Sequence, residues 1–167
     1  MKSTLLKIAM IVAVVAVIHS CKDDDDDTPP APSADESLYD EITASGYSFY
    51  QGGVILAAAS ASPHGPFKLR FNATALAALD GTGELPSGNA FPSGSILVKE
   101  VYDGLDLDLY AVMKKDPTNS NSGAGWVWAE YDSDGTVITS ISSSGTACVS
   151  CHDDTPNRDL VRTFDLH

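Results

Sequence analysis

Alternation of hydrophobic and polar positions dominates the second half of the chain and predicts an antiparallel sheet. Residues 67–71 (FKLRF) alternate strictly, which is typical of a strand with one buried face. Asp103-Gly104 is a turn signal between two stretches rich in β-branched and aromatic residues, so we expect those stretches to pair as a hairpin. The predicted strands are residues 67–71, 95–102, 105–113, 126–131 and 136–138.

Helical signals are short and lie outside these strands. Residues 38–42 carry apolar positions at helical spacing after an acidic first turn, which predicts a short helix. Asn72 is a suitable cap for residues 73–79, whose alanine and leucine content favours a helix. Residues 54–59 suit either a buried strand or a helix start. The predicted fold class is therefore α+β, with an antiparallel sheet and a few short helices.

The N-terminus has the pattern of a bacterial lipoprotein signal peptide. Lys2 and Lys7 precede an apolar run, residues 8–18, which is too short to span a bilayer comfortably. Cys21 follows where a lipidated cysteine is expected, so residues 1–20 are predicted to be removed. We expect an exported outer-membrane lipoprotein on the periplasmic or cell-surface face. Cleavage without lipidation and a retained anchor helix are the alternatives.

An acidic, proline-containing stretch follows the cysteine. Residues 21–36 include five consecutive aspartates, whose repulsion favours an extended tether; the run also resembles a surface-export signal of some lipoproteins. Residues 37–167 then have the usual size of a single domain.

The charge balance excludes one class of partner. The chain has 10 Lys and Arg against 23 Asp and Glu, a net charge of −13. Nucleic-acid binding needs a positive surface, and none is visible, so we expect no nucleic-acid partner.

Cys148-Val-Ser-Cys151-His152 is the C-x-x-C-H pattern of covalent haem c attachment. In this pattern both thiols add to the porphyrin vinyl groups and the histidine binds the iron. The alternatives are a dithiol redox motif, half of a zinc site and a structural disulfide. A zinc site lacks further ligands in this sequence, and a redox motif belongs early in a βαβ unit rather than at the end of an antiparallel domain.

The position of the motif indicates an open sixth iron position. Small electron-transfer cytochromes c carry the motif near the N-terminus and a methionine ligand downstream, whereas no methionine follows His152 here. Met113 lies on a predicted strand and suits core packing.

Three further features accompany the haem motif: residues 91–102 (FPSGSILVKEVY), Gly125-Trp126 at the start of a strand, and residues 159–164 (DLVRTF). In this order they resemble the cytochrome P460 family, which includes the cytochromes c′-beta. The resemblance implies a curved antiparallel sheet with helices around a five-coordinate haem. It also implies either hydroxylamine oxidation, using a lysine cross-linked to the porphyrin, or binding of nitric oxide and similar diatomics without the cross-link.

The lysine that matches the family is Lys99. On a strand it shares a face with Leu97 and Val101, and burial beside a haem would lower its pKa; an edge lysine reaching solvent is the alternative. Glu130 follows Trp126 and Trp128 on one strand face and is a candidate distal proton acceptor. Arg70 is expected on a solvated face.

These observations leave three functional hypotheses. The first is a haem protein with an open site that binds or oxidises a small nitrogen ligand, served by a redox partner protein. The second is a six-coordinate electron-transfer lipoprotein, with Met113, His64 or Lys99 as the sixth ligand. The third is a surface interaction module with a vestigial haem. All three leave a homodimer open.

Overall fold

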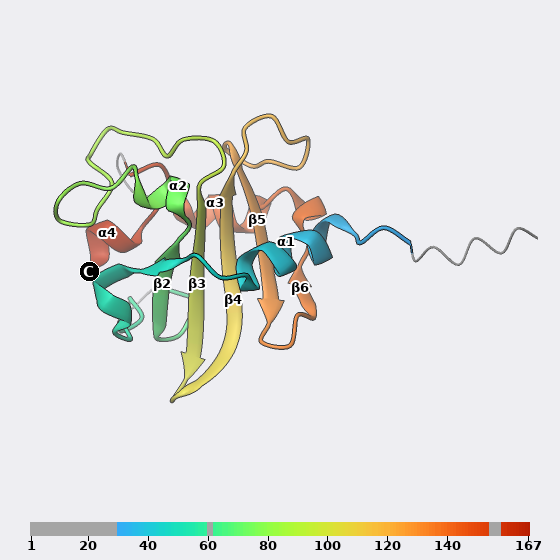
Figure 1. Ribbon diagram of the computed structural model, residues 1–167, viewed down its shortest axis with the longest axis horizontal. Coiled ribbons are helices and arrows are strands. Elements are labelled where there is room, and N and C mark those ends of the chain that lie inside the picture. The colour runs from blue at the N-terminus through green and yellow to red at the C-terminus, as the bar shows by residue number, and fades with distance from the viewer. Residues whose placement is uncertain (1–29, 60–61, 154–157) are drawn as a thin grey trace, which may run out of the picture. The chain divides into compact units, whose positions relative to one another are not determined.

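The structure is a computed structural model that describes residues 30–59, 62–153 and 158–167. Within the unit Ala31–His167, six strands form one open antiparallel sheet in which consecutive strands are neighbours (Figure 1). The strands are β1 (Ser48–Phe49), β2 (Phe67–Phe71), β3 (Ile96–Asp103), β4 (Asp106–Lys115), β5 (Trp126–Asp132) and β6 (Val137–Thr139). The helices are α1 (Ala34–Thr43), α2 (Ala73–Leu76), α3 (Thr146–His152) and α4 (Thr163–Leu166), with 3₁₀ turns η1 (Tyr50–Gly53) and η2 (Ile141–Ser143). The predicted α+β class is confirmed.

Two predicted elements differ from the structure. Residues 54–59 form no strand; Leu56 alone makes an isolated bridge, to Phe67. The helix expected over residues 73–79 ends at Leu76, because the amides of Ala78 and Leu79 bond three residues back instead of four.

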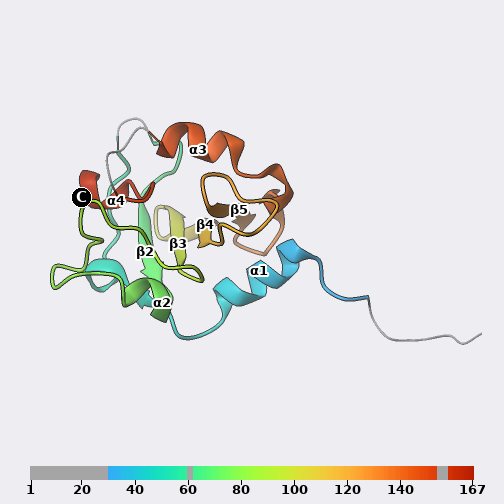
Figure 2. The ribbon, with the colours of Figure 1, turned by 90° about the horizontal axis from the view of Figure 1, so that it is seen from above.

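The sheet separates two hydrophobic cores. Helix α1 covers one face, where Leu38 and Ile42 pack on Val98 and Val112. Helix α3 lies on the opposite face (Figure 2). The core on that second face contains Trp126 and the C-terminal Phe164. Because side chains alternate along a strand, each central strand contributes to both cores.

The predicted signal peptide, Cys21 and residues 21–29 of the predicted tether lie outside the described residues. Among the described residues, no helix is both long enough and apolar enough to cross a membrane.

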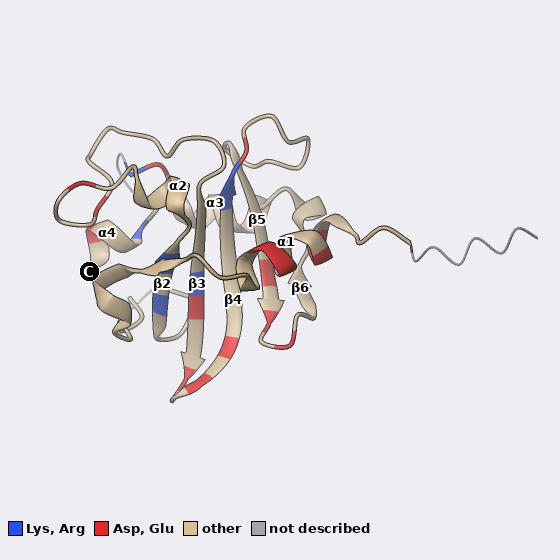
Figure 3. Cartoon of the chain, in the orientation of Figure 1, with Lys and Arg blue, Asp and Glu red and all other residues tan. Residues whose placement is uncertain are grey.

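Charged side chains are unevenly distributed along the strands. Figure 3 shows acidic residues at the turn between β3 and β4, where Asp103 and Asp106 face each other across the hairpin, and at the turn after β5. Basic residues lie on β2, β3 and β4. The basic residues sit within the sheet, where a buried charge is costly unless a partner compensates it.

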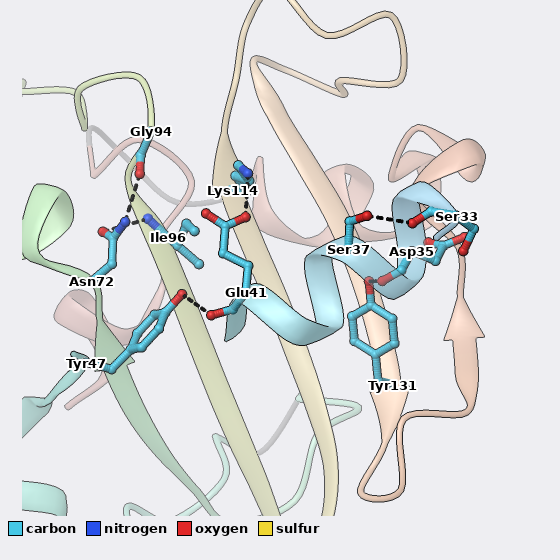
Figure 4. A network of polar contacts seen from close by, with 10 residues as sticks. All are labelled: Ser33, Asp35, Ser37, Glu41, Tyr47, Asn72, Gly94, Ile96, Lys114 and Tyr131. Carbon is cyan, nitrogen blue, oxygen red and sulfur yellow. Dashed lines mark hydrogen bonds and ion pairs between the residues drawn. The ribbon is translucent and has the colours of Figure 1, made fainter. Parts of the chain in front are cut away.

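Helix α1 is fixed to the sheet by hydrogen bonds at both of its ends (Figure 4). Its first turn is a capping box, in which Ser33 and Glu36 satisfy each other's backbone amides. The Tyr131 hydroxyl donates to the Asp35 carbonyl at 2.9 Å, and Lys114 pairs with Glu41 at 2.6 Å near the C-terminal end. Polar contacts therefore set the position of the helix over its apolar core.

Arg70 is buried, so the expectation of a solvated face was wrong. Only 7% of the residue is exposed, and its Nε donates to Glu100 Oε1 at 2.6 Å on the α1 side of the sheet. Its Nη1 also donates to the Ile42 carbonyl at 2.7 Å, at the end of α1. The side chain caps a helix C-terminus, where a cation is favourable.

We expect Glu100→Gln to lower the free energy of unfolding by roughly 3 kcal/mol, because it leaves the buried Arg70 charge without a counter-ion. The matched control is Glu41→Gln, which breaks the exposed pair with Lys114 and should cost less than about 1 kcal/mol. Chemical denaturation of both variants measures the difference, and equal losses would contradict a buried pair at Arg70.

Candidate functional site

A cavity of about 690 Å³ lies between the sheet and its C-terminal helices. Strand register builds its floor, because directly paired residues on neighbouring strands point to the same side. One row across the sheet consists of Leu69, Lys99, Ala111, Glu130 and Thr139, all of which line the cavity. The small Ala111 separates Lys99 from Glu130 and leaves the space between them open.

Helix α3 carries Cys148, Cys151 and His152 against this cavity. The helix begins after Gly145, whose φ of +61° and contact with Trp128 both require glycine. A Cβ at this position would lie 2.0 Å from Trp128 Cδ1. The helix therefore packs directly on the sheet, and its two cysteines are not joined in a disulfide.

His152 is held in a defined orientation. Its Nδ1 lies 2.7 Å from the Leu160 carbonyl oxygen, which can only accept, so Nδ1 carries the proton and Nε2 is the unprotonated nitrogen. Its ring also packs edge-on against Trp128, with 4.9 Å between centroids. Burial lowers the pKa of His152 to about 4, so the imidazole is neutral near pH 7, which is the form that binds a metal.

The Leu160 carbonyl is positioned by an unusual backbone segment. Asp159 and Leu160 have φ values of +51° and +71°, which non-glycine residues rarely adopt. Asp159 is held by Lys115 Nζ at 2.7 Å, by the Phe91 amide at 2.8 Å and by Trp126 Nε1 at 3.4 Å. These contacts to three other segments offset the backbone strain and fix the carbonyl that orients His152.

Lys99 faces the cavity from the centre of β3. Its Nζ lies 4.1 Å from the centroid of the Phe67 ring, and no carboxylate in the described part of the chain lies within 4.0 Å. Burial, with a smaller contribution from the nearby Arg162 charge, lowers the pKa of Lys99 to about 8. A substantial fraction of this amine is therefore neutral and nucleophilic near pH 8.

Glu130, the candidate distal proton acceptor, is paired with two side chains. Its Oε1 lies 3.2 Å from His64 Nε2, and its Oε2 accepts from the Thr139 hydroxyl at 2.7 Å. The hydrogen bond from His64, with that from Thr139, lowers the pKa of Glu130 against the opposing effect of burial. Sequence reasoning had considered His64 only as an iron ligand, because residues 54–66 carry no period that places a side chain.

Arg162 is a cavity residue that sequence reasoning had not singled out. Its Nη1 donates to the Cys151 carbonyl at 2.7 Å and contacts the Cys151 Sγ at 3.0 Å. Its Nε is buried without a hydrogen-bond partner in the described residues. In the sequence it stands out only as part of residues 159–164, which carry the family resemblance, and no local pattern assigns it a role.

Comparison with known families matches residues 68–163 to the family described as Cytochrome P460. The chain belongs to this family. Family membership implies a covalently bound haem, and the protein is therefore a haem c cytochrome. A comparison with curated proteins finds no match.

The residues that line the cavity suit a haem. Cys148 and Cys151 offer two thiols within one helix, and His152 offers a neutral imidazole beside them. Two buried nitrogens, Arg162 Nε and His64 Nδ1, have no partner in the described residues and could serve groups of a bound cofactor. The remaining walls are largely apolar, as cofactor sites usually are.

The three residues considered as sixth ligands all line this cavity. Met113 is 8% exposed and packs in the hydrophobic core, whereas Lys99 and His64 present nitrogen atoms. All three residues therefore line the same cavity as His152.

We expect Asp159→Ala to weaken the His152 contact, because the Leu160 carbonyl loses the contacts that hold its backbone. In the ferrous holoprotein, the iron–histidine stretching frequency measured by resonance Raman spectroscopy should fall, and unfolding free energy should drop by roughly 3 kcal/mol. Asp103→Ala, at the exposed hairpin turn between β3 and β4, is the control and should change neither. An unchanged iron–histidine band in Asp159→Ala would contradict this role.

Proposed function

We propose that this cytochrome binds haem through thioethers to Cys148 and Cys151, with His152 as the proximal ligand, and keeps the sixth iron position open for a small nitrogen ligand. The ligand would be hydroxylamine, which is oxidised, or nitric oxide, which is bound. The observation that carries the proposal is the set of polar groups in the His152 cavity. A buried lysine and an imidazole–carboxylate pair share a space that a simple electron carrier would fill with apolar packing and one ligand.

The bound haem would supply an iron atom that takes the ligand at its open position and exchanges electrons. The chain itself would orient His152 through Leu160 and exclude water with Trp128 and Val161, both buried in the cavity wall. Arg162, with its unpartnered Nε, suits an anionic group such as a haem propionate.

Lys99 would decide between the two activities. Its neutral amine could form the porphyrin cross-link that the family uses for hydroxylamine oxidation: an N–C bond would replace one N–H bond of the amine and one C–H bond of the porphyrin, and the two electrons released would pass to an external oxidant such as a peroxide. Without the cross-link, the same residue would serve as a cation beside a bound diatomic ligand, and the protein would bind without turnover. The low pKa of Lys99 supports the first alternative because it raises the fraction of nucleophilic amine.

The cavity also supports a second candidate, a six-coordinate electron-transfer cytochrome. This alternative rests on Met113, His64 and Lys99 lining the His152 cavity. It predicts a low-spin spectrum in both oxidation states.

We also propose that the protein is exported and anchored by lipid at Cys21, at the periplasmic or outer face of the outer membrane. The acidic turns of the sheet would favour a redox partner with a basic docking surface. The ionic-strength dependence of electron transfer would report that contact.

We expect the full chain, produced with haem-maturation machinery, to carry one haem that survives denaturation. Intact mass should fall by one haem in Cys148→Ser/Cys151→Ser, because without either thiol the maturation machinery attaches no haem, and none is then held where Lys99 could react with it. The ferric protein should be high-spin, and the ferrous protein should take up carbon monoxide at once. A low-spin spectrum in both states would favour the electron-transfer alternative, and a colourless protein would support a vestigial site.

Mass spectrometry of the holoprotein tests the Lys99 cross-link. We expect the Lys99 peptide to remain joined to haem, and we expect the yield to rise as the pH passes about 8, where the amine becomes neutral. Lys99→Arg keeps the charge but should abolish the cross-link, because its guanidinium stays protonated. An unmodified Lys99 peptide from the wild-type holoprotein would contradict it.

A further inference from the structure

The pair formed by His64 and Glu130 lies in the same cavity as His152 but has no role in haem attachment. Only 18% of the His64 side chain and 22% of the Glu130 side chain are exposed. His64 comes from the segment between η1 and β2, and Glu130 from the centre of β5. Glu130 receives hydrogen bonds on both oxygens, from His64 and from Thr139, which hold the carboxylate in place.

The pairing sets the tautomer of the neutral imidazole. The carboxylate lies 3.2 Å from Nε2 and is an acceptor, so Nε2 carries the hydrogen of a neutral His64. The other nitrogen, Nδ1, then carries the lone pair of the ring. This nitrogen is buried and has no hydrogen-bond partner in the described residues. A buried acceptor without a partner is costly unless a ligand completes it.

We propose that His64, oriented by Glu130, is the hydrogen-bond acceptor for the ligand bound in this cavity, and that it makes the site selective for ligands that donate a hydrogen. Hydroxylamine carries N–H and O–H groups and fits this acceptor, whereas carbon monoxide and nitric oxide have no hydrogen to donate. A carboxylate that orients one imidazole nitrogen so that the other meets a ligand is a recurring arrangement in protein sites. The inference rests on the open haem site proposed above and adds a basis for its selectivity.

Glu130 is a positioning residue in this arrangement. It acts through His64 and sets which imidazole nitrogen carries the proton. That Glu130 itself accepts a proton stays a separate prediction, because each of its oxygens keeps a second lone pair beside its contact with His64 or Thr139.

Ligand titration of the holoprotein tests the proposal. We expect His64→Leu to weaken hydroxylamine binding to the ferric protein about tenfold, which corresponds to one lost hydrogen bond. Carbon monoxide affinity of the ferrous protein should change by less than about twofold. The matched control is Asn89→Leu, an exposed polar residue outside the cavity lining, which should leave both affinities unchanged.

Two further measurements separate positioning from a structural effect. Glu130→Ala should also reduce the preference for hydroxylamine, and the double variant with His64→Leu should be no weaker than His64→Leu alone. In the ferrous carbon monoxide complex, His64→Leu should lower the infrared C–O stretching frequency, because it removes a lone pair near the ligand. The control variant should keep the wild-type frequency.

The outcomes distinguish this inference from the function on which it rests. A ferrous protein that takes up no carbon monoxide would overturn the open haem site itself. Normal uptake, with hydroxylamine affinity and C–O frequency unchanged in His64→Leu, would overturn only the His64 assignment. A low-spin ferric spectrum that becomes high-spin in His64→Leu would make His64 an iron ligand and would also overturn it.

Discussion

The packing of helix α3 on Trp128 is the contact on which the site depends. Gly145 allows the helix to begin within van der Waals reach of the indole, and His152 at the other end of the helix touches the same ring. This contact sets the distance between the C-x-x-C-H segment and the sheet, and therefore the width of the cavity. The Asp159 contacts then close the cavity by bringing the C-terminal segment back to β4 and β5.

Buried basic side chains have different surroundings on the two faces of the sheet. On the α1 face, Arg70 lies against Glu100 and the end of a helix, so its charge is compensated within the fold. On the cavity face, Lys99 one strand away lies over the Phe67 ring, and no carboxylate of the described residues lies within 4.0 Å of its Nζ. A compensated ion pair stabilises structure at most, whereas an uncompensated amine has a shifted pKa and chemical reactivity. The difference separates a structural charge from a candidate functional one.

The sequence correctly predicted features that follow from the local period of a strand. It did not predict side-chain environments that depend on contacts between distant segments. Alternation correctly placed Lys99 on the face of Leu97 and Val101, because a strand fixes that relationship locally. It gave the wrong environment for Arg70, since the burial of that residue depends on α1, which lies far away in sequence. The contact between Leu160 and His152 could not be predicted from the sequence, because it uses the backbone carbonyl, which every residue type has. The pairing of His64 was equally hidden in a segment without regular structure.

One row of side chains crosses the sheet on the cavity side: Leu69, Lys99, Ala111, Glu130 and Thr139. Whether an insertion within a strand preserves this row depends on whether the number of added residues is odd or even. Inserting one residue into β3 ahead of Lys99 would turn its side chain toward α1 and bring a neighbour into the cavity. An insertion of two residues would shift the row along the strand yet keep every side chain on its own face. We therefore expect insertions and deletions to be tolerated at the hairpin turns. Within a strand, a single inserted residue would move the polar side chains of the cavity face into the α1 core and bring core side chains into the cavity.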